Sequence, residues 1–204
     1  MTTGKTKGNA INATDKASRS SEPCVKALES RKAGRTRTGG KVTHTLEPVY
    51  DQNSRILILG TMPSPKSREY GFYYSHPQNR FWPVMGELFS IAPPATREER
   101  IHFLHNHYIA LWDVLHSCVI HGAGDASIRR PEANNLLPLL TQAPIQEIFT
   151  TGRKATYLYN KYCFPSTRKR SVYLPSTSAA NRGAFSLEQL CAIYRAALLP
   201  CFSN

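Results

Sequence analysis

The sequence predicts an α/β fold, a three-layer α/β/α sandwich around a central, mostly parallel four-stranded sheet. Short apolar runs that end at glycine or proline alternate with segments whose apolar residues have helical spacing. Strands separated by helices favour a parallel sheet that is covered on both faces. The chain has 204 residues, of which 41% are hydrophobic and 20% charged, so it can bury a core of ordinary size and is not disordered throughout.

Four apolar runs are expected to form the sheet. The first is Arg55–Gly60, a short run closed by glycine, which is typical of a strand buried on both faces. The remaining three strands are expected at 108–114, 146–151 and 171–174.

Helices are expected between and after these strands. Apolar residues at helical spacing predict a helix over Asn79–Phe89. The string Thr96-Arg-Glu-Glu is a capping-box pattern, which opens a second helix that runs to Asn106. Further helices are expected at 138–142, from Gly152 to Tyr162, and from the cap Ser186 to Leu198.

The first 45 residues differ from the rest in composition. They are rich in Thr, Ser, Lys, Arg and Gly, and their basic residues exceed their acidic ones by seven, out of a net charge of +12 for the whole chain. We therefore expect a disordered basic arm at 1–45 and one domain at 46–204. The arm could grip phosphates without sequence preference or serve as a targeting address, or it could be a solvated leader with no role.

The charge balance indicates a polyanionic partner, most simply nucleic acid, because Lys and Arg number 26 against 14 Asp and Glu. No apolar run approaches the ~20 residues of a membrane-spanning helix, and the N-terminus lacks the apolar stretch of a signal peptide. The five cysteines are scattered and form no CxxC pair, so neither a zinc site nor a disulfide framework is expected. An intracellular protein is expected, in the cytoplasm or nucleoid, or in a nucleus.

The four strand ends are where chemistry is expected, because parallel α/β sheets bind ligands at the carboxyl ends of their strands. These ends are Gly60–Ser64, Asp113, Thr151–Gly152 and Pro175–Ser178.

The segment after the first strand combines rigid-loop residues with aromatic and amide side chains. Aromatic rings can stack on a planar base, and amides can read its edge. Lys66, Arg68 and Arg80 could hold phosphates. The pattern predicts a pocket for a flat heterocycle beside a basic surface, with Phe81 and Trp82 expected in the core.

Several strings in the chain resemble the uracil-DNA glycosylase superfamily. The string Gly71-Phe-x-x-x-His-Pro-x-Asn-Arg-Phe-Trp82 is similar to its mismatch-specific branch and its hypoxanthine-DNA (deoxyinosine) glycosylase branch. Leu174-Pro-Ser-Thr-Ser-Ala-Ala-Asn181 is similar to the superfamily's His/Asn-Pro-Ser loop, which enters the minor groove. Leu111–Cys118 and Gly124–Ile128 resemble the deoxyinosine branch in particular. The resemblance covers nearly the whole expected domain.

The resemblance implies a uracil-DNA glycosylase-like fold and a monofunctional DNA glycosylase of base-excision repair. Such an enzyme hydrolyses the N-glycosidic bond of a deaminated base, here expected to be hypoxanthine, and leaves an abasic site. It implies DNA that contains deaminated bases as the partner, with no cofactor. We expect a monomer that does not associate with membranes.

Two departures from the family's pattern bear on substrate and mechanism. Met62 stands where uracil enzymes carry a water-polarising Asp and mismatch-specific enzymes an Asn. Leu174 stands where uracil enzymes place a His that donates to the pyrimidine O2. Because hypoxanthine carries only hydrogen at C2, the loss of that donor fits a purine better than uracil.

Asn79 and Ser176 are the expected catalytic residues. Asn79 would orient the attacking water, with helix capping as an alternative or additional role, and Ser176 and its neighbours would pinch the phosphates. The residues expected to bind the base are Gly60, Thr61, Met62, Pro63, Ser64, Tyr74 and Thr151. Those expected to contact DNA are Lys66, Arg80, Pro175, Ser176, Thr177, Ser178, Asn181 and Arg182.

Two carboxylates, Asp113 and Asp125, could act as a general acid or base. Each has a structural alternative, Asp113 as a cap and Asp125 as a partner of Arg129 or Arg130. No metal site is expected, because the histidines lack ligand spacing.

Other functions stay open at this point. The chain could be a uracil- or thymine-specific mismatch glycosylase, or a catalytically weak nucleic-acid-binding member of the superfamily. It could also be a small-molecule hydrolase on a similar sheet, which would lack the steep salt dependence that phosphate contacts impose.

Overall fold

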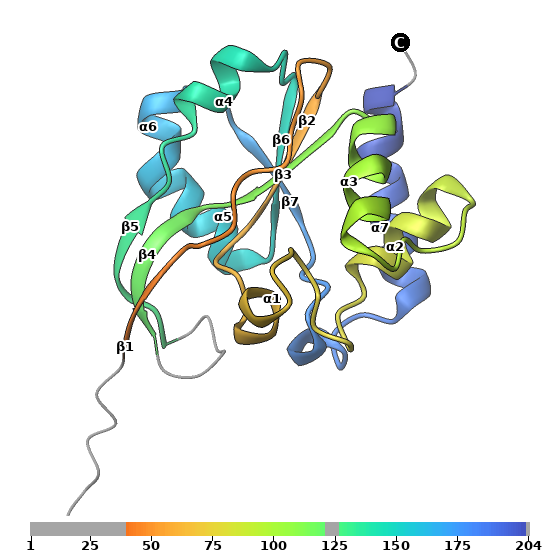
Figure 1. Ribbon diagram of the computed structural model, residues 1–204, viewed down its shortest axis with the longest axis horizontal. Coiled ribbons are helices and arrows are strands. Elements are labelled where there is room, and N and C mark those ends of the chain that lie inside the picture. Colours follow the sequence, from red (N-terminus) through yellow and green to blue (C-terminus); the bar gives the residue numbers. More distant parts are fainter. Residues whose placement is uncertain (1–39, 121–126, 203–204) are drawn as a thin grey trace, which may run out of the picture. The chain divides into compact units, whose positions relative to one another are not determined.

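The main sheet has four parallel strands, as the sequence predicts. The computed structural model describes residues 40–120 and 127–202. Within them the strands lie in the order β3-β2-β6-β7, and every neighbouring pair is parallel (Figure 1). Their bounds are Ile56–Gly60 for β2, Ile109–Asp113 for β3, Glu147–Thr151 for β6 and Ser171–Leu174 for β7.

The helices cover both faces of this sheet, which confirms the three-layer sandwich (Figure 1). One face carries α2 (Phe81–Phe89), α3 (Arg97–Asn106) and α7 (Leu187–Leu198). The other face carries α4 (Leu137–Gln142), α5 (Arg153–Leu158), the short π-helix η2 (Tyr159–Cys163) and α6 (Phe164–Thr167).

The side chains of β2 show how the sheet serves two cores. Ile56 and Ile58 pack into the cluster beneath α2 and α7, whereas Leu57 and Leu59 pack into the cluster beneath α5. All four are fully buried, so β2 reads as an unbroken apolar run rather than an alternating one.

The expected caps are present. Thr96 Oγ1 accepts from the N–H of Glu99 at 3.1 Å, and the Glu99 carboxylate accepts from the N–H of Thr96, also at 3.1 Å. Ser186 and Gln189 form the same reciprocal pair at the start of α7. Each box satisfies two backbone donors that the first helical turn leaves without partners.

A second sheet was not predicted. Its three strands are antiparallel, in the order β1-β4-β5, with bounds Gly40–Thr43, Leu115–Ile120 and Arg129–Ala133. Only Val114 separates β3 from β4, so one stretch of chain serves both sheets. The segment after β1 runs back along the edge of β3, where Val49 forms a bridge with Leu111.

The position of β1 moves the expected domain boundary. The expected basic arm includes residues 40–45, but Gly40–Thr43 pair with β4, and the N–H of His44 donates to the carbonyl of His116 at 2.7 Å. The remainder of the arm, 1–39, lies outside the described residues, so its disorder stays a prediction.

Two connecting segments complete the folded part. The loop expected after β2 contains a short helix, α1 (Pro65–Glu69), whose cap Ser64 accepts from the N–H of Ser67 at 3.1 Å. Past β7 come two 3₁₀ turns, η3 (Ala179–Asn181) and, after α7, η4 (Leu199–Phe202). Among the described residues, no helix is long and apolar enough to cross a membrane.

Candidate active site

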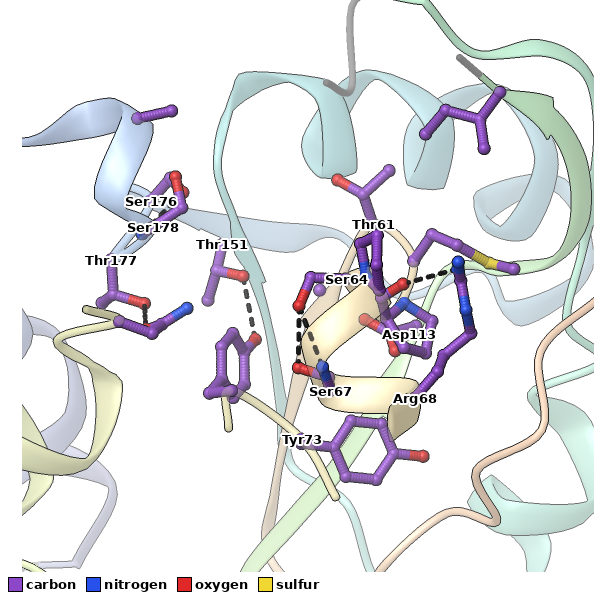
Figure 2. A pocket seen from close by; sticks show the side chains of 18 residues that line it. Thr61, Ser64, Ser67, Arg68, Tyr73, Asp113, Thr151, Ser176, Thr177 and Ser178 are labelled. Carbon is purple, nitrogen blue, oxygen red and sulfur yellow. Dashed lines mark hydrogen bonds between the residues drawn. The ribbon is translucent and has the colours of Figure 1, made fainter. Parts of the chain in front are cut away.

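A cavity of about 230 Å³ lies at the carboxyl ends of β2, β3 and β6 (Figure 2). All seven residues that the sequence assigns to base binding line it, namely Gly60, Thr61, Met62, Pro63, Ser64, Tyr74 and Thr151. Asn79, Asp113, Ser176, Thr177 and Ser178 line it as well. Four segments far apart in the sequence therefore converge on one cavity, as expected from the parallel sheet.

The floor of the cavity depends on a glycine. Gly60 and Asp113 pair across β2 and β3, and a Cβ at position 60 would overlap Oδ1 of Asp113. The hydroxyl of Tyr74 would lie 3.3 Å from the same Cβ. Only glycine therefore lets the Asp113 carboxylate lie against the end of β2.

Asp113 is paired with a histidine that sequence reasoning missed. The Oδ2 atom of Asp113 lies 2.9 Å from Nε2 of His44, and the two side chains are only 6% and 3% exposed. The N–H of Leu46 donates to His44 Nδ1 at 3.2 Å. Because Nδ1 accepts a hydrogen bond, Nε2 is the ring nitrogen that donates to Asp113.

No sequence signal marks His44. It lies in a segment with the composition of the basic arm, and only the pairing of β1 with β4 brings it to the end of β3.

Tyr73 packs beside this pair and carries no exposed hydroxyl. Its O–H donates to the carbonyls of Leu46 and Glu47, at 3.1 and 2.9 Å. Burial raises the pKa of Tyr73 far above its ordinary value, and the nearby charge of Asp113 raises that pKa further. The phenol is therefore a neutral donor that holds the segment following His44.

Tyr74 is held in an uncommon backbone conformation. Its φ is 53°, in the left-handed region that few residues other than glycine adopt. One face of its ring stacks on Phe81, with centroids 4.0 Å apart and planes 12° apart. Its hydroxyl shares a hydrogen bond with Thr151 Oγ1 at 3.0 Å. Phe81 and Trp82 are core residues, as predicted.

Asn79 joins the two loops of the cavity. Its Oδ1 accepts from the N–H of Phe81 at 2.9 Å and from the hydroxyl of Thr177 at 2.8 Å. The first bond is an Asx-turn that precedes α2, whose N-cap is Arg80 and has no side-chain cap bond, so Asn79 is not the N-cap residue. Since both bonds go to the oxygen, the group that Asn79 can offer to a ligand is its N–H₂.

The loop after β7 is braced from within. Its three residues Ser176, Thr177 and Ser178 line the cavity, and Asn181 Nδ2 donates to the carbonyl of Ser176 at 2.7 Å. Pro175 is buried, and its carbonyl accepts from the hydroxyl of Tyr194 at 2.8 Å. Pro175 and Asn181 therefore shape the loop rather than the cavity wall.

The basic residues expected to contact DNA are placed very differently. Arg80 is turned inward: its Nη1 donates to the carbonyl of Phe185, and its Nε and Nη2 are buried without hydrogen-bond partners among the described residues. The guanidinium thus faces the protein although Arg80 is partly exposed, and its contact with a phosphate stays a prediction. Lys66 is half exposed and pairs with Glu69 at 2.8 Å, and Arg182 is exposed.

Two further expectations concern Asp125 and metal binding. Asp125 lies outside the described residues. Across residues 40–120 and 127–202, no three His, Cys, Asp or Glu side chains gather where they could hold a metal ion.

Fold and cavity together define the class: a three-layer α/β protein with a small polar cavity at the carboxyl edge of its parallel sheet. A family model described as the Uracil DNA glycosylase superfamily matches residues 47–198. The chain belongs to this superfamily.

Two curated relatives and one solved structure from Methanosarcina species are similar to this chain. Curated relatives from Methanosarcina barkeri and Methanosarcina acetivorans, both named hypoxanthine DNA glycosylase, are 31% and 34% identical to this chain over 136 residues. The matched region is 66% of this chain and 85% of each relative. A solution NMR structure of a candidate uracil DNA glycosylase from M. acetivorans has a TM-score of 0.63 and 31% identity, covering 76% of this chain and 97% of that one.

Proposed function

We propose that this chain is a monofunctional DNA glycosylase that removes a deaminated base, hypoxanthine above others, from DNA. The observation that carries the proposal is the meeting of Tyr74, Asn79 and Asp113 around one cavity, in a chain of this superfamily with relatives named for hypoxanthine. Such work belongs inside the cell, in the cytoplasm or nucleoid, or in a nucleus, and needs only a monomer.

The cavity suits a single base. Its volume of about 230 Å³ is below the roughly 300–1,000 Å³ of pockets that enclose drug-sized ligands. A target nucleotide flipped out of the duplex would therefore place its base in the cavity and leave the sugar and phosphates at its mouth. Phe81 covers one face of the Tyr74 ring, so the base would stack on the other face.

Hydrolysis needs a water on the side of the sugar opposite the base. The bond between C1′ and the base nitrogen breaks, the water oxygen bonds to C1′, and the proton released by the water ends on the base. Asn79 would hold this water through its N–H₂, since its oxygen is occupied by Phe81 and Thr177. An amide is not a strong base, so it would act by orienting the water as the base departs.

The rest of the interface would hold the DNA strand. Ser176 and Ser178 can donate hydrogen bonds to phosphates beside the flipped nucleotide, whereas the hydroxyl of buried Thr177 donates to Asn79. The exposed side chains of Lys66 and Arg182 would add electrostatic attraction to the DNA phosphates. Binding should therefore weaken steeply as salt concentration rises.

Duplexes with a single modified base test the proposal. Each would hold one deoxyinosine or deoxyuridine opposite T, C or G, and alkali would reveal abasic sites after incubation. We expect cleavage mainly at deoxyinosine. Cleavage mainly at deoxyuridine would refute the choice of hypoxanthine, and salt-sensitive binding without cleavage would refute the enzymatic proposal.

A further inference from the structure

We propose that the outer surface of α5, η2 and β7 is a second nucleic-acid site, which binds a single strand of DNA outside the cavity. This surface contains a groove of about 490 Å³, which we call the tyrosine groove. Its lining residues are Arg153, Thr156, Tyr157, Asn160 and Tyr173, and none of them lines the candidate active site. The inference goes beyond the proposed function, because binding a single strand requires neither a flipped base nor hydrolysis.

The tyrosine groove lies between a helical face and an edge strand. Its four residues from α5 and η2 are spaced three or four positions apart, so they share one face of this helical segment. Strand β7 stands at the end of the strand order β3-β2-β6-β7. Tyr173 on this edge completes the groove from the side of the sheet.

The two tyrosines present rings on which bases can stack. Tyr157 is 57% exposed and Tyr173 is 41% exposed. Lys154 and Lys161 lie 5.8 and 6.0 Å from the centroid of the Tyr157 ring, at the outer limit of about 6 Å for a cation–π contact. The lysines therefore leave room on the ring and place positive charge beside it. Aromatic rings next to cations are the combination by which proteins bind single strands without sequence preference.

The charge around the tyrosine groove has one sign. Between Gly152 and Pro175 the sequence contains six basic residues and no acidic one. Lys154 is partly exposed, and the others are exposed, namely Arg153, Lys161, Arg168, Lys169 and Arg170. None of the six forms an ion pair with another described residue. Such a surface attracts polyanions, and exposed tyrosines among the charges favour a polyanion that carries flat bases.

A single strand fits the tyrosine groove better than a duplex does. Stacking requires a base with a free face, and the bases of a duplex are stacked on one another. The groove also begins beside the cavity, because Arg153 follows Gly152, and a Cβ at Gly152 would lie 3.3 Å from that of Ser176 in the cavity wall. DNA is favoured over RNA because the chain belongs to a superfamily named for DNA.

Four substitutions separate stacking from charge. Tyr157→Ala and Tyr173→Ala each remove one ring from the groove, whereas Tyr157→Phe keeps its ring. Lys161→Ala removes one positive charge and no ring.

Two further variants are controls. Tyr108→Ala removes a ring that is 40% exposed and has the guanidinium of Arg55 4.9 Å from its centroid. Tyr108 precedes β3, the strand at the opposite edge of the sheet, so it matches Tyr173 in exposure but not in place. Tyr74→Ala removes the ring of the cavity instead. Thermal melts would show that each variant is folded.

Fluorescence anisotropy would measure binding of labelled twelve-residue oligomers to the full-length protein. The first oligomer is oligo(dC), which contains no deaminated base. The second carries tetrahydrofuran in place of every base, so it keeps the phosphates and cannot stack. Oligo(rC) and oligoglutamate represent RNA and an acidic protein segment. Residues 1–39 are the same in every variant, so differences between variants report on the tyrosine groove.

We expect the wild type to bind oligo(dC) more tightly than the other three oligomers. Tyr157→Ala and Tyr173→Ala should each weaken this binding by about 10-fold, the scale of one base–aromatic stack. Tyr157→Phe, Tyr108→Ala and Tyr74→Ala should stay within twofold of the wild type. Lys161→Ala should reduce the slope of log affinity against log salt by about 0.7, the value for one phosphate contact on a single strand.

Several results would overturn the inference. Equal affinity for oligo(dC) and the abasic oligomer would leave attraction between charges alone. Wild-type affinity in both alanine variants of the groove, or an equal loss in Tyr108→Ala, would remove the role of the two rings. An equal loss in Tyr74→Ala would place the strand in the cavity. Tighter binding of oligo(rC) or oligoglutamate would assign the groove to RNA or to an acidic protein segment.

Failure of this inference is distinguishable from failure of the proposed function. A protein that binds oligo(dC) through the two tyrosines but releases no base from modified duplexes would refute only the proposed function. A protein that releases hypoxanthine but binds oligo(dC) no better than the abasic oligomer would refute only the tyrosine groove.

Discussion

The two sheets of this protein contribute to the candidate site in different ways. The parallel sheet supplies the cavity directly, because the ends of β2, β3 and β6 line it. The antiparallel sheet supplies it indirectly, because β1 carries the chain to His44 and so to the carboxylate of Asp113. Strand β2 is wholly buried and apolar, whereas β5 reads Arg-Arg-Pro-Glu-Ala and is largely exposed. A site can thus depend on a sheet whose strands lack the apolar runs by which buried strands are predicted.

The largest effect should come from Asn79, where the two cavity loops meet. Asn79→Ala removes the N–H₂ proposed to hold the water, and the loss of such an oriented donor lowers turnover by roughly 10²–10³-fold. Duplex binding, measured by fluorescence anisotropy with an uncleavable substrate, should stay nearly unchanged.

Asn79→Asp is the control that separates chemistry from structure. It keeps an oxygen for Phe81 and Thr177 but loses the N–H₂. Asn79→Ala should therefore also lose about 0.5–1.5 kcal/mol of stability for each of the two hydrogen bonds that its oxygen accepts, whereas Asn79→Asp should not. Full activity in Asn79→Asp would leave Asn79 with the structural role alone.

Glycines in the two sheets offer a direct test of the comparison. Gly60→Ala in β2 places a methyl group on the Asp113 carboxylate, which should cost about 1–3 kcal/mol in stability, as overpacking does. It should also slow hypoxanthine release severalfold or more. Gly40→Ala in β1 meets nothing within 4 Å, so thermal melts and rates should match the wild type. Equal behaviour of the two variants would contradict the close packing at the cavity floor.

Substitutions of Tyr74 should have an intermediate effect on the reaction rate. Two variants separate the contribution of ring stacking from that of the hydroxyl group. Tyr74→Ala removes the stacking ring and should weaken the reaction by about 1–3 kcal/mol. Tyr74→Phe keeps the ring and loses the hydrogen bond to Thr151, worth about 0.5–1.5 kcal/mol. Single-turnover rates would measure both, and identical losses in the two variants would argue against stacking.

The smallest effect should come from the exposed side of the antiparallel sheet. Lys41 and Glu132 form an ion pair 3.7 Å apart whose side chains are 63% and 60% exposed. Such pairs contribute little, because water and salt screen them. Lys41→Ala should have the same melting temperature and the same rate of base release as the wild type, within measurement error. A clear loss of activity would show that the antiparallel sheet acts through more than His44.

The parallel sheet could be predicted because the signals for its strands and helices lie within short stretches of sequence. Each strand is a short apolar run ended by glycine, proline or a polar residue, and the caps Thr96 and Ser186 mark helix starts that the structure reproduces. The cavity followed from the same pattern, since parallel strands bring their carboxyl ends to one edge. The antiparallel strands lack these signals, because exposed strands need no apolar run.

Side-chain direction is the part that the sequence could not supply. Arg80 follows Asn79 directly, yet one side chain faces the cavity and the other is enclosed beside Phe185. The pairing of His44 with Asp113 joins residues 69 positions apart, and nothing local to either residue indicates it. The role of Leu174 is also plainer in the structure, where it is fully buried and donates nothing to a base.

The most direct test of the central claim is the identity of the released base. The wild type and Asn79→Asp would be incubated with one duplex that holds a deoxyinosine and a deoxyuridine far apart, and free bases would be quantified by mass spectrometry. The account predicts that the wild type releases hypoxanthine well ahead of uracil, and that Asn79→Asp releases almost none. Release of uracil ahead of hypoxanthine, or of no base at all by the wild type, would contradict it.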